Sequence, residues 1–458
     1  MTKPLRRVLV VVGALLAFAP AAFAPAAFAA KNVERVVSPG GIEAWLVRDT
    51  SVPLLSIEFS FRGGAVSDPA GKEGRADFAT DLMTEGAGDL DSQAFQKVLE
   101  DRAIRLSFDA GLDAVQGSLR TLVANRDTAV DLLRLALTRP RFDAADVERV
   151  RAQKLADLAH ASTNPNSIAR RAWLAAAYLE HPYGRDPRGT PEAVKSLGPD
   201  DFRAFVAERL ARDNLVIGAV GDITAAELGP LVDRAFGGLP PRSAPVAVAE
   251  TSPQGEGRTI LVRMSVPQSV VVFGAPGLKR DDPDYYVALV ANYILGGGGF
   301  NSRLTNEVRE KRGLAYSMST GLSPLDHSGQ FTGGTGTQNA RLAETMQVMR
   351  EVLRRMRDDG PTGEELADAK RNLTGSFALG LDSTGRIART LVGMQYEKLG
   401  IDFLDKRNGY IEAVTLDQAR AIARRLFDDR RFLIVVVGNP SGFVASEERA
   451  GPAAGRGG

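Results

Sequence analysis

Hydrophobic and polar residues alternate with two different periods along this chain. Alternation at every second residue predicts β-strands, and apolar residues three and four positions apart predict helices. Before residue 223, the pattern predicts strands at 44–47, 54–61, 104–110, 114–122 and 215–222 and helices at 76–83, 92–100, 128–137, 144–160, 168–179 and 199–212. Strands and long helices are therefore mixed throughout this region.

The same kind of pattern starts again in the second half of the chain. It predicts strands at 269–273 and 432–437 and helices at 283–295, 341–357, 364–379 and 416–427. The strand end Val-Gly-Asp at 220–222 corresponds to Val-Gly-Asn at 437–439, an offset of about 217 residues. This self-similarity indicates a duplicated unit. We expect an α+β fold of two homologous halves, each a mainly antiparallel sheet with helices packed on one face.

Composition places the boundaries between these regions. We expect one domain at 31–238 and another at 259–440, because residues 239–258 are rich in Pro, Gly, Ser and Ala and are typical of a linker. Residues 441–458 end in Gly, Pro and Ala, so we predict a disordered tail.

The first thirty residues have the pattern of a secretory signal peptide. Lys3, Arg6 and Arg7 precede an apolar stretch, and an alanine-rich segment with a small-x-small cleavage site at 27–29 follows. The alternative is an uncleaved membrane anchor, for which the apolar stretch is short. We expect an exported protein that has no membrane segment after cleavage, most simply in a bacterial periplasm.

Charge and cysteine content exclude several functions. The formal net charge is +1, and basic residues are mixed with acidic ones along the chain, so there is no electrostatic footprint for nucleic acid. The chain has no cysteine, which excludes disulfides and thiolate chemistry.

One run of residues carries the candidate chemistry. It begins with Gly296, Gly297, Gly298, Gly299, Phe300 and Asn301. Glycines allow close backbone approach to another chain or a ligand, and the following helix is predicted to stop at Gly313 before a strand opens at Tyr316. Arg309 and Tyr316 therefore lie near one helix end, where a guanidinium and a phenol can hold a peptide carbonyl or its oxyanion. The alternative is a surface cation and a packed ring.

This run resembles the C-terminal half of the pitrilysin, insulinase and mitochondrial processing peptidase family of zinc metallopeptidases. The resemblance covers nearly all of the chain between the signal peptide and the tail. It implies that Arg309 and Tyr316 bind substrate and stabilise the transition state, and that the glycine loop with Phe300 and Asn301 faces substrate. It also implies that the two halves form a clam shell.

The zinc-binding residues of that family are missing. Its inverted His-x-x-Glu-His motif falls on a helix where this chain has Asp77 and Asp81 at the histidine positions and Thr80 at the general base, and the distant ligand falls at about Asp157. The chain's three histidines are His160, His181 and His327, at no ligand spacing. Carboxylates alone suit a hard cation such as Ca²⁺ or Mg²⁺ better than zinc, and Thr80 cannot act as a general base near neutral pH.

The resemblance thus points to a non-catalytic subunit of a heterodimeric zinc metallopeptidase. This chain would hold no cofactor and be inactive alone, and a homologous partner subunit would carry the zinc motif and act with it on peptide substrates. Two alternatives remain open. One is a peptide-binding or scaffold protein of the same fold, and the other is a self-contained hydrolase with a metal bound by Asp77 and Asp81.

Overall fold

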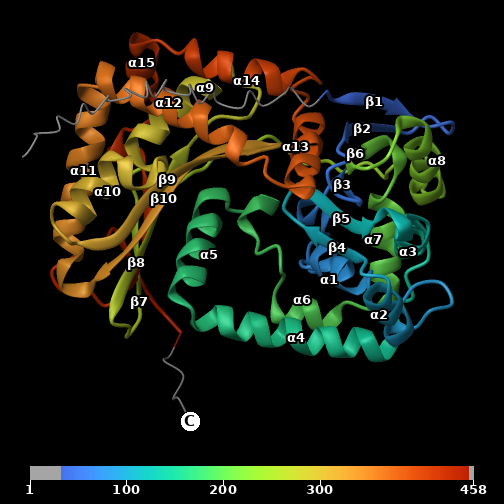
Figure 1. Cartoon of the computed structure of the whole chain (residues 1–458). Helices are drawn as coiled ribbons and strands as arrows, with labels where there is room; N and C mark the ends of the chain where they lie inside the picture. Colours follow the sequence, from blue (N-terminus) through green and yellow to red (C-terminus); the bar gives the residue numbers. More distant parts are fainter. Residues whose placement is uncertain (1–31, 453–458) are drawn as a thin grey trace, which may run out of the picture.

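A computed structural model describes residues 32–452, which form two six-stranded sheets with helices around them (Figure 1). The signal-peptide prediction lies outside the described residues. The first half contains the helices α1 (Arg75–Leu82), α2 (Ser92–Asp101), α3 (Arg126–Thr138), α4 (Ala144–Thr163), α5 (Pro165–Tyr178), α6 (Pro191–Ser196), α7 (Pro199–Arg209) and α8 (Ala225–Phe236). The second contains α9 (Tyr285–Asn292), α10 (Arg303–Thr305), α11 (Leu342–Asp358), α12 (Gly363–Leu379), α13 (Thr384–Tyr396), α14 (Phe403–Glu412) and α15 (Leu416–Leu426).

The two sheets have the same strand order. The first runs β1 (Glu34–Val37), β2 (Glu43–Arg48), β6 (Leu215–Gly221), β3 (Leu54–Arg62), β5 (Ala114–Leu122) and β4 (Arg105–Ala110). The second runs β12 (Glu447–Ala450), β7 (Thr259–Arg263), β11 (Leu433–Gly438), β8 (Gln268–Pro276), β10 (Ser328–Gln338) and β9 (Ala315–Leu325). β6 and β11, the strands whose ends look alike in sequence, occupy equivalent places. The predicted α+β fold of two similar halves is confirmed.

The C-terminal segment differs from the prediction. β12 lies within the residues for which composition predicted disorder, and it pairs in parallel with β7 from Glu447 to Ala450. It takes the edge position that β1 holds in the first sheet. The edge of β7 offers unpaired backbone groups, and their hydrogen bonds order a segment that has no apolar pattern of its own.

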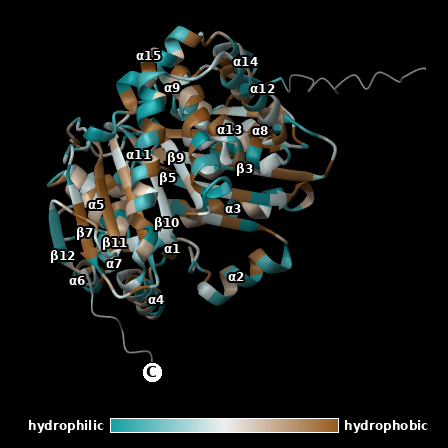
Figure 2. Cartoon of the chain, turned by 90° about the vertical axis from the view of Figure 1, so that its left-hand side faces the viewer, coloured by the Kyte–Doolittle hydropathy of each residue, from teal (hydrophilic) through white to brown (hydrophobic). Residues whose placement is uncertain are grey.

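Each sheet turns its apolar face toward the helices of its own half. In β4 and β5 the buried positions alternate with exposed ones, so that Leu106, Phe108 and Leu119 enter the core with α1, α3 and α8. In Figure 2, coloured by hydropathy, brown strands lie around β7 and β11, whereas α14 and α15 mix brown and teal. None of the helices within residues 32–452 has the length and apolar character needed to cross a bilayer.

The halves exchange one helix each. α13 of the second half packs on β6 and β3 of the first sheet, and α5 of the first half packs on β11 and β8 of the second (Figure 1). Glycines permit the close approach: a Cβ at Gly218 would lie 2.4 Å from the Ala388 carbonyl oxygen, and one at Gly274 would lie 2.5 Å from the Trp173 ring. Helix packing of this kind fixes the two halves against one another.

Polar contacts complete the junction between the halves. The Asp326 amide of the second half donates to the Asp113 carboxylate of the first over 3.0 Å, and the Tyr396 hydroxyl donates to the Asp113 carbonyl over 3.1 Å. The predicted linker carries no helix or strand, but its Thr251 amide donates to the His327 carbonyl over 2.9 Å. Its Gln254 amide donates to the Ala177 carbonyl of the first half over 2.7 Å, so the linker lies against both halves.

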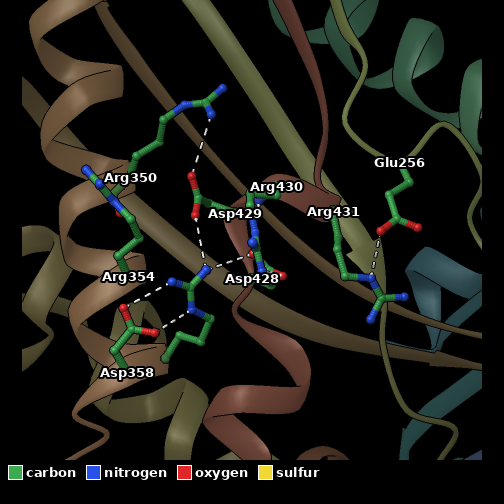
Figure 3. A network of polar contacts seen from close by, with 9 residues as sticks. Glu256, Arg350, Arg354, Asp358, Asp428, Asp429, Arg430 and Arg431 are labelled. Carbon is green, nitrogen blue, oxygen red and sulfur yellow. Dashed lines mark hydrogen bonds and ion pairs between the residues drawn. The ribbon is translucent and has the colours of Figure 1, made fainter.

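A charged network anchors the strand β11 (Figure 3). It lies at the 3₁₀ turn η9 (Asp429–Arg431), which connects α15 to β11. Arg357 of α11 pairs with Asp428 over 2.9 Å, and Arg431 pairs with Glu256 of the linker over 3.1 Å. These ion pairs tie α11, η9 and the linker together.

Candidate functional site

Arg309 lies in the second of two π-helical turns in the glycine-rich region. The first, η5 (Tyr293–Gly297), extends α9, and the second, η7 (Asn306–Glu310), extends α10. π-Turns are rare and occur frequently at functional sites. Gly313 then adopts φ +56°, its amide donates to the Arg309 carbonyl over 2.9 Å, and β9 begins two residues later. The predicted helix, glycine stop and strand are confirmed here.

The structure brings Arg309, Phe300 and Tyr316 into contact, and we call these residues the arginine–aromatic cluster. The Arg309 Cζ atom lies 4.5 Å from the centroid of the Phe300 ring and 4.5 Å from that of Tyr316. Both distances suit cation–π attraction, which orients the guanidinium. Phe300 is 64% exposed and Tyr316 is 80% exposed. Within residues 32–452 the Tyr316 hydroxyl has no hydrogen-bond partner, so it can donate to a ligand.

The four glycines have different roles. A Cβ at Gly296 would lie 2.4 Å from the Thr320 hydroxyl oxygen, and one at Gly297 would lie 2.7 Å from the Asn292 amide nitrogen. The close approach expected of these two is therefore made to β9 and α9 of the same chain. Gly298 lies close to the Tyr293 carbonyl, and Gly299 adopts φ +58° at an open position.

A polar cavity opens beside this loop. Its volume is about 430 Å³, and it lies between the loop, η7 and α12. Its lining includes the amides of Asn301, Asn306 and Asn372, which can donate and accept hydrogen bonds. Glu365, at its wall, is held by Arg303 over 2.6 Å. The arrangement can accept peptide backbone groups next to Phe300.

The positions that correspond to zinc ligands are arranged differently. Asp77 and Asp81 lie one turn apart on α1, and the buried ammonium of Lys154 on α4 pairs with both carboxylates, with an Nζ to Oδ2 distance of 2.7 Å for Asp81. We call these three residues the aspartate–lysine cluster. Burial lowers the pKa of Lys154, but Asp77 and Asp81 raise it by more, so the pKa lies above its ordinary value. Lys154 therefore remains charged near neutral pH.

The other two predicted positions do not complete a metal site. Thr80 is buried, and its hydroxyl donates to the carbonyls of Ala76 and Asp77 over 3.1 Å and 3.0 Å. Asp157 is exposed on α4, one turn beyond Lys154. Among residues 32–452 no group of three or more potential ligands is close enough to hold a metal ion. Two carboxylates that already share an ion pair with one buried ammonium do not fit a catalytic zinc, which needs free ligands and a bound water.

Lys154 is the residue that sequence reasoning missed. Its spacing of three residues before Asp157 places the two on neighbouring turns of one helix. No sequence pattern shows that the lysine is buried against α1, because that depends on how α4 packs.

Residues 196–373 match the family model described as the peptidase M16 inactive domain. An uncharacterized zinc protease of Mycobacterium tuberculosis is 31% identical over 345 residues, which cover 71% of this chain and 78% of the relative. The non-peptidase homolog YmxG of Helicobacter pylori is 26% identical, covering 84% and 89%. A probable mitochondrial-processing peptidase subunit beta of Schizosaccharomyces pombe is 24% identical, covering 86% and 88%.

A comparison with solved structures gives the same family as the comparison of sequences. A crystal structure of a peptidase M16 inactive domain from Pseudomonas fluorescens has a TM-score of 0.83 and 28% identity, and the match covers 90% of this chain and 99% of that one. The fold, together with aspartates at the positions that correspond to zinc ligands, defines an inactive-type, non-catalytic relative of a peptidase. This chain belongs to the peptidase M16 family.

Proposed function

We propose that this chain is the non-catalytic subunit of a heterodimeric zinc metallopeptidase that hydrolyses peptides outside the cytoplasm. The observation that supports this most directly is the arginine–aromatic cluster, in which a partly exposed cation lies against an exposed, free phenol. The aspartate–lysine cluster, whose carboxylates already pair with Lys154, supports a zinc site on a second chain rather than here. A relative that is named as a subunit of a processing peptidase supports assembly with a second chain.

In this proposal a homologous partner supplies the zinc, which would polarise the scissile carbonyl and activate a water. Arg309 would bind the substrate carbonyl and the negative charge that develops on its oxygen, and the Tyr316 hydroxyl would donate a hydrogen bond to it. The Phe300 ring, which contacts the Arg309 guanidinium as the Tyr316 ring does, would help to hold this guanidinium in place. Export through the predicted signal peptide would place both subunits in the periplasm.

The test is reconstitution with the zinc-motif homologue from the same cell. We expect peptide turnover only in the mixture, with zinc bound to the partner. Tyr316→Phe removes one donor to the oxyanion and should lower the turnover number about a hundredfold, while size-exclusion chromatography shows unchanged assembly. The control is Tyr410→Phe, an exposed phenol on α14, which should leave turnover unchanged.

Other outcomes identify the alternatives. Unchanged turnover in Tyr316→Phe would rule out the role of this residue. Activity and bound metal in the lone chain would favour the aspartate-bound hydrolase instead. No activity in the mixture would favour the scaffold, which the non-peptidase name of the Helicobacter pylori relative also supports.

A further inference from the structure

The polar face of the first sheet carries arginines that neither cluster described above uses. β4 and β5 place Arg105 and Arg120 directly opposite each other in register. Like charges at opposed positions destabilise a strand pair. An arrangement that costs stability without a structural gain is typical of a functional site.

A cavity of about 580 Å³ lies over this pair, between the end of α2 and the start of α13. α13 adds Arg386 and Arg389 to its lining, and we call the four arginines with this cavity the arginine pocket. Two carboxylates, Glu58 and Glu100, also line it. Four guanidinium groups therefore share the cavity with two acids.

The four arginines of the pocket differ in the ion pairs that they form with other residues. Arg389 lies 3.6 Å from Glu58, and Arg386 pairs with Asp382 over 3.2 Å at the exposed rim. The guanidinium groups of Arg105 and Arg120 make no hydrogen bond or ion pair with any residue in the range 32–452, apart from a longer-range attraction between Arg120 and Glu58. These two side chains can each offer a full set of donors to a ligand.

The start of α13 is shaped around Arg120. A Cβ at Gly385 would lie 2.8 Å from the Arg120 Nη2 atom, so a side chain there would push this guanidinium aside. Ser383 caps the helix by accepting the Arg386 amide. The first turn of a helix carries partial positive charge, which adds to the field of the arginines.

We infer that the arginine pocket binds the carboxylates of an acidic peptide segment. Guanidinium groups hold carboxylates through paired hydrogen bonds, and Arg105 and Arg120 stand side by side to receive neighbouring acids. The cavity is much larger than a single phosphate ion, which favours a chain of residues over a small anion. The inference rests on the proposed function in taking peptides as the ligand, and it adds a preference for acidic ones.

The test measures binding of a fluorescent peptide to the purified mature chain alone. The peptide carries four consecutive glutamates, and a matched peptide carries four glutamines. The double variant Arg105→Gln and Arg120→Gln should weaken binding of the glutamate peptide at least about tenfold, since each charge-assisted contact is worth about that factor. Gly385→Ala, which crowds Arg120, should weaken it to a smaller extent. Arg102→Gln, an exposed arginine of the same region outside the pocket, is the control and should bind like the wild type.

A thermal melt separates binding from folding. Removing the opposed like charges should leave the melting temperature unchanged or raise it, so loss of binding would not reflect unfolding. Equal binding of the two peptides, equal binding by the double variant, or full displacement by millimolar inorganic phosphate would overturn the inference. Because the lone chain is used, this result is independent of turnover in the reconstituted mixture, and either idea can fail without the other.

Discussion

The aspartate–lysine cluster of the first half and the arginine–aromatic cluster of the second half differ in where their charges are satisfied. In the first, the buried ammonium of Lys154 pairs with two carboxylates, those of Asp77 and Asp81. In the second, Arg309 pairs with its exposed neighbour Glu310 over 3.3 Å and contacts two aromatic rings that are largely exposed. The first cluster is closed to further ligands, and the second is open to them. Two halves with one strand order therefore differ in which of them presents a charged cluster to solvent.

The largest effect should come from removing the buried cation. Lys154→Met leaves Asp77 and Asp81 without a partner, and breaking a buried pair costs about 3–5 kcal/mol. Because the Asp81 side chain is half exposed, we expect a loss at the lower end, about 3 kcal/mol. Urea unfolding of the wild type and the variant measures it.

The matched control is Lys72→Met, whose partner Asp201 lies 3.0 Å away at a more exposed site. It should cost about 1 kcal/mol or less. Adding Asp77→Asn to Lys154→Met should recover part of the loss, because one unpaired charge is removed. Equal losses for Lys154→Met and Lys72→Met would show that the aspartate–lysine cluster is not closed by this lysine.

The next largest effect should be a pH dependence of the stability that the aspartate–lysine cluster contributes. The pKa of Lys154 is raised above its ordinary value of 10.5 by its two aspartates, in spite of burial. A raised lysine pKa contributes stability that is fully present below 10.5 and is lost as the pH rises through the higher folded-state value. The stability difference between wild type and Lys154→Met should therefore shrink above pH 10.5. Urea unfolding from pH 8 to about 11.5 tests this, and a constant difference would contradict it.

The sequence was sufficient where local spacing decides the structure. Arg309 and Tyr316 are seven residues apart across a helix end and a strand start, and the glycine stop at Gly313 makes their side chains meet. The repeated strand ends identified the duplication because β6 and β11 pair with their neighbours in the same way.

Contacts between distant segments could not be predicted in this way. The burial of Lys154 depends on α4 crossing α1, and the order of β12 depends on the free edge of β7. The exchange of α5 and α13 between the halves leaves no pattern in either helix, because an apolar face shows that a helix is covered but not by which sheet. The arginine pocket likewise combines residues more than two hundred positions apart.

The smallest effect on stability should come from substitutions in the arginine–aromatic cluster. Arg309→Gln removes two cation–π contacts, each worth about 0.5 kcal/mol at exposed sites, and an exposed ion pair with Glu310 that adds little. The free energy of unfolding should therefore fall by about 1 kcal/mol. Tyr316→Phe keeps the ring and should change it by less than about 0.5 kcal/mol. Urea unfolding measures both. A larger loss in Tyr316→Phe would mean that the hydroxyl serves the fold, and the contrast between a closed first cluster and an open second one would fail.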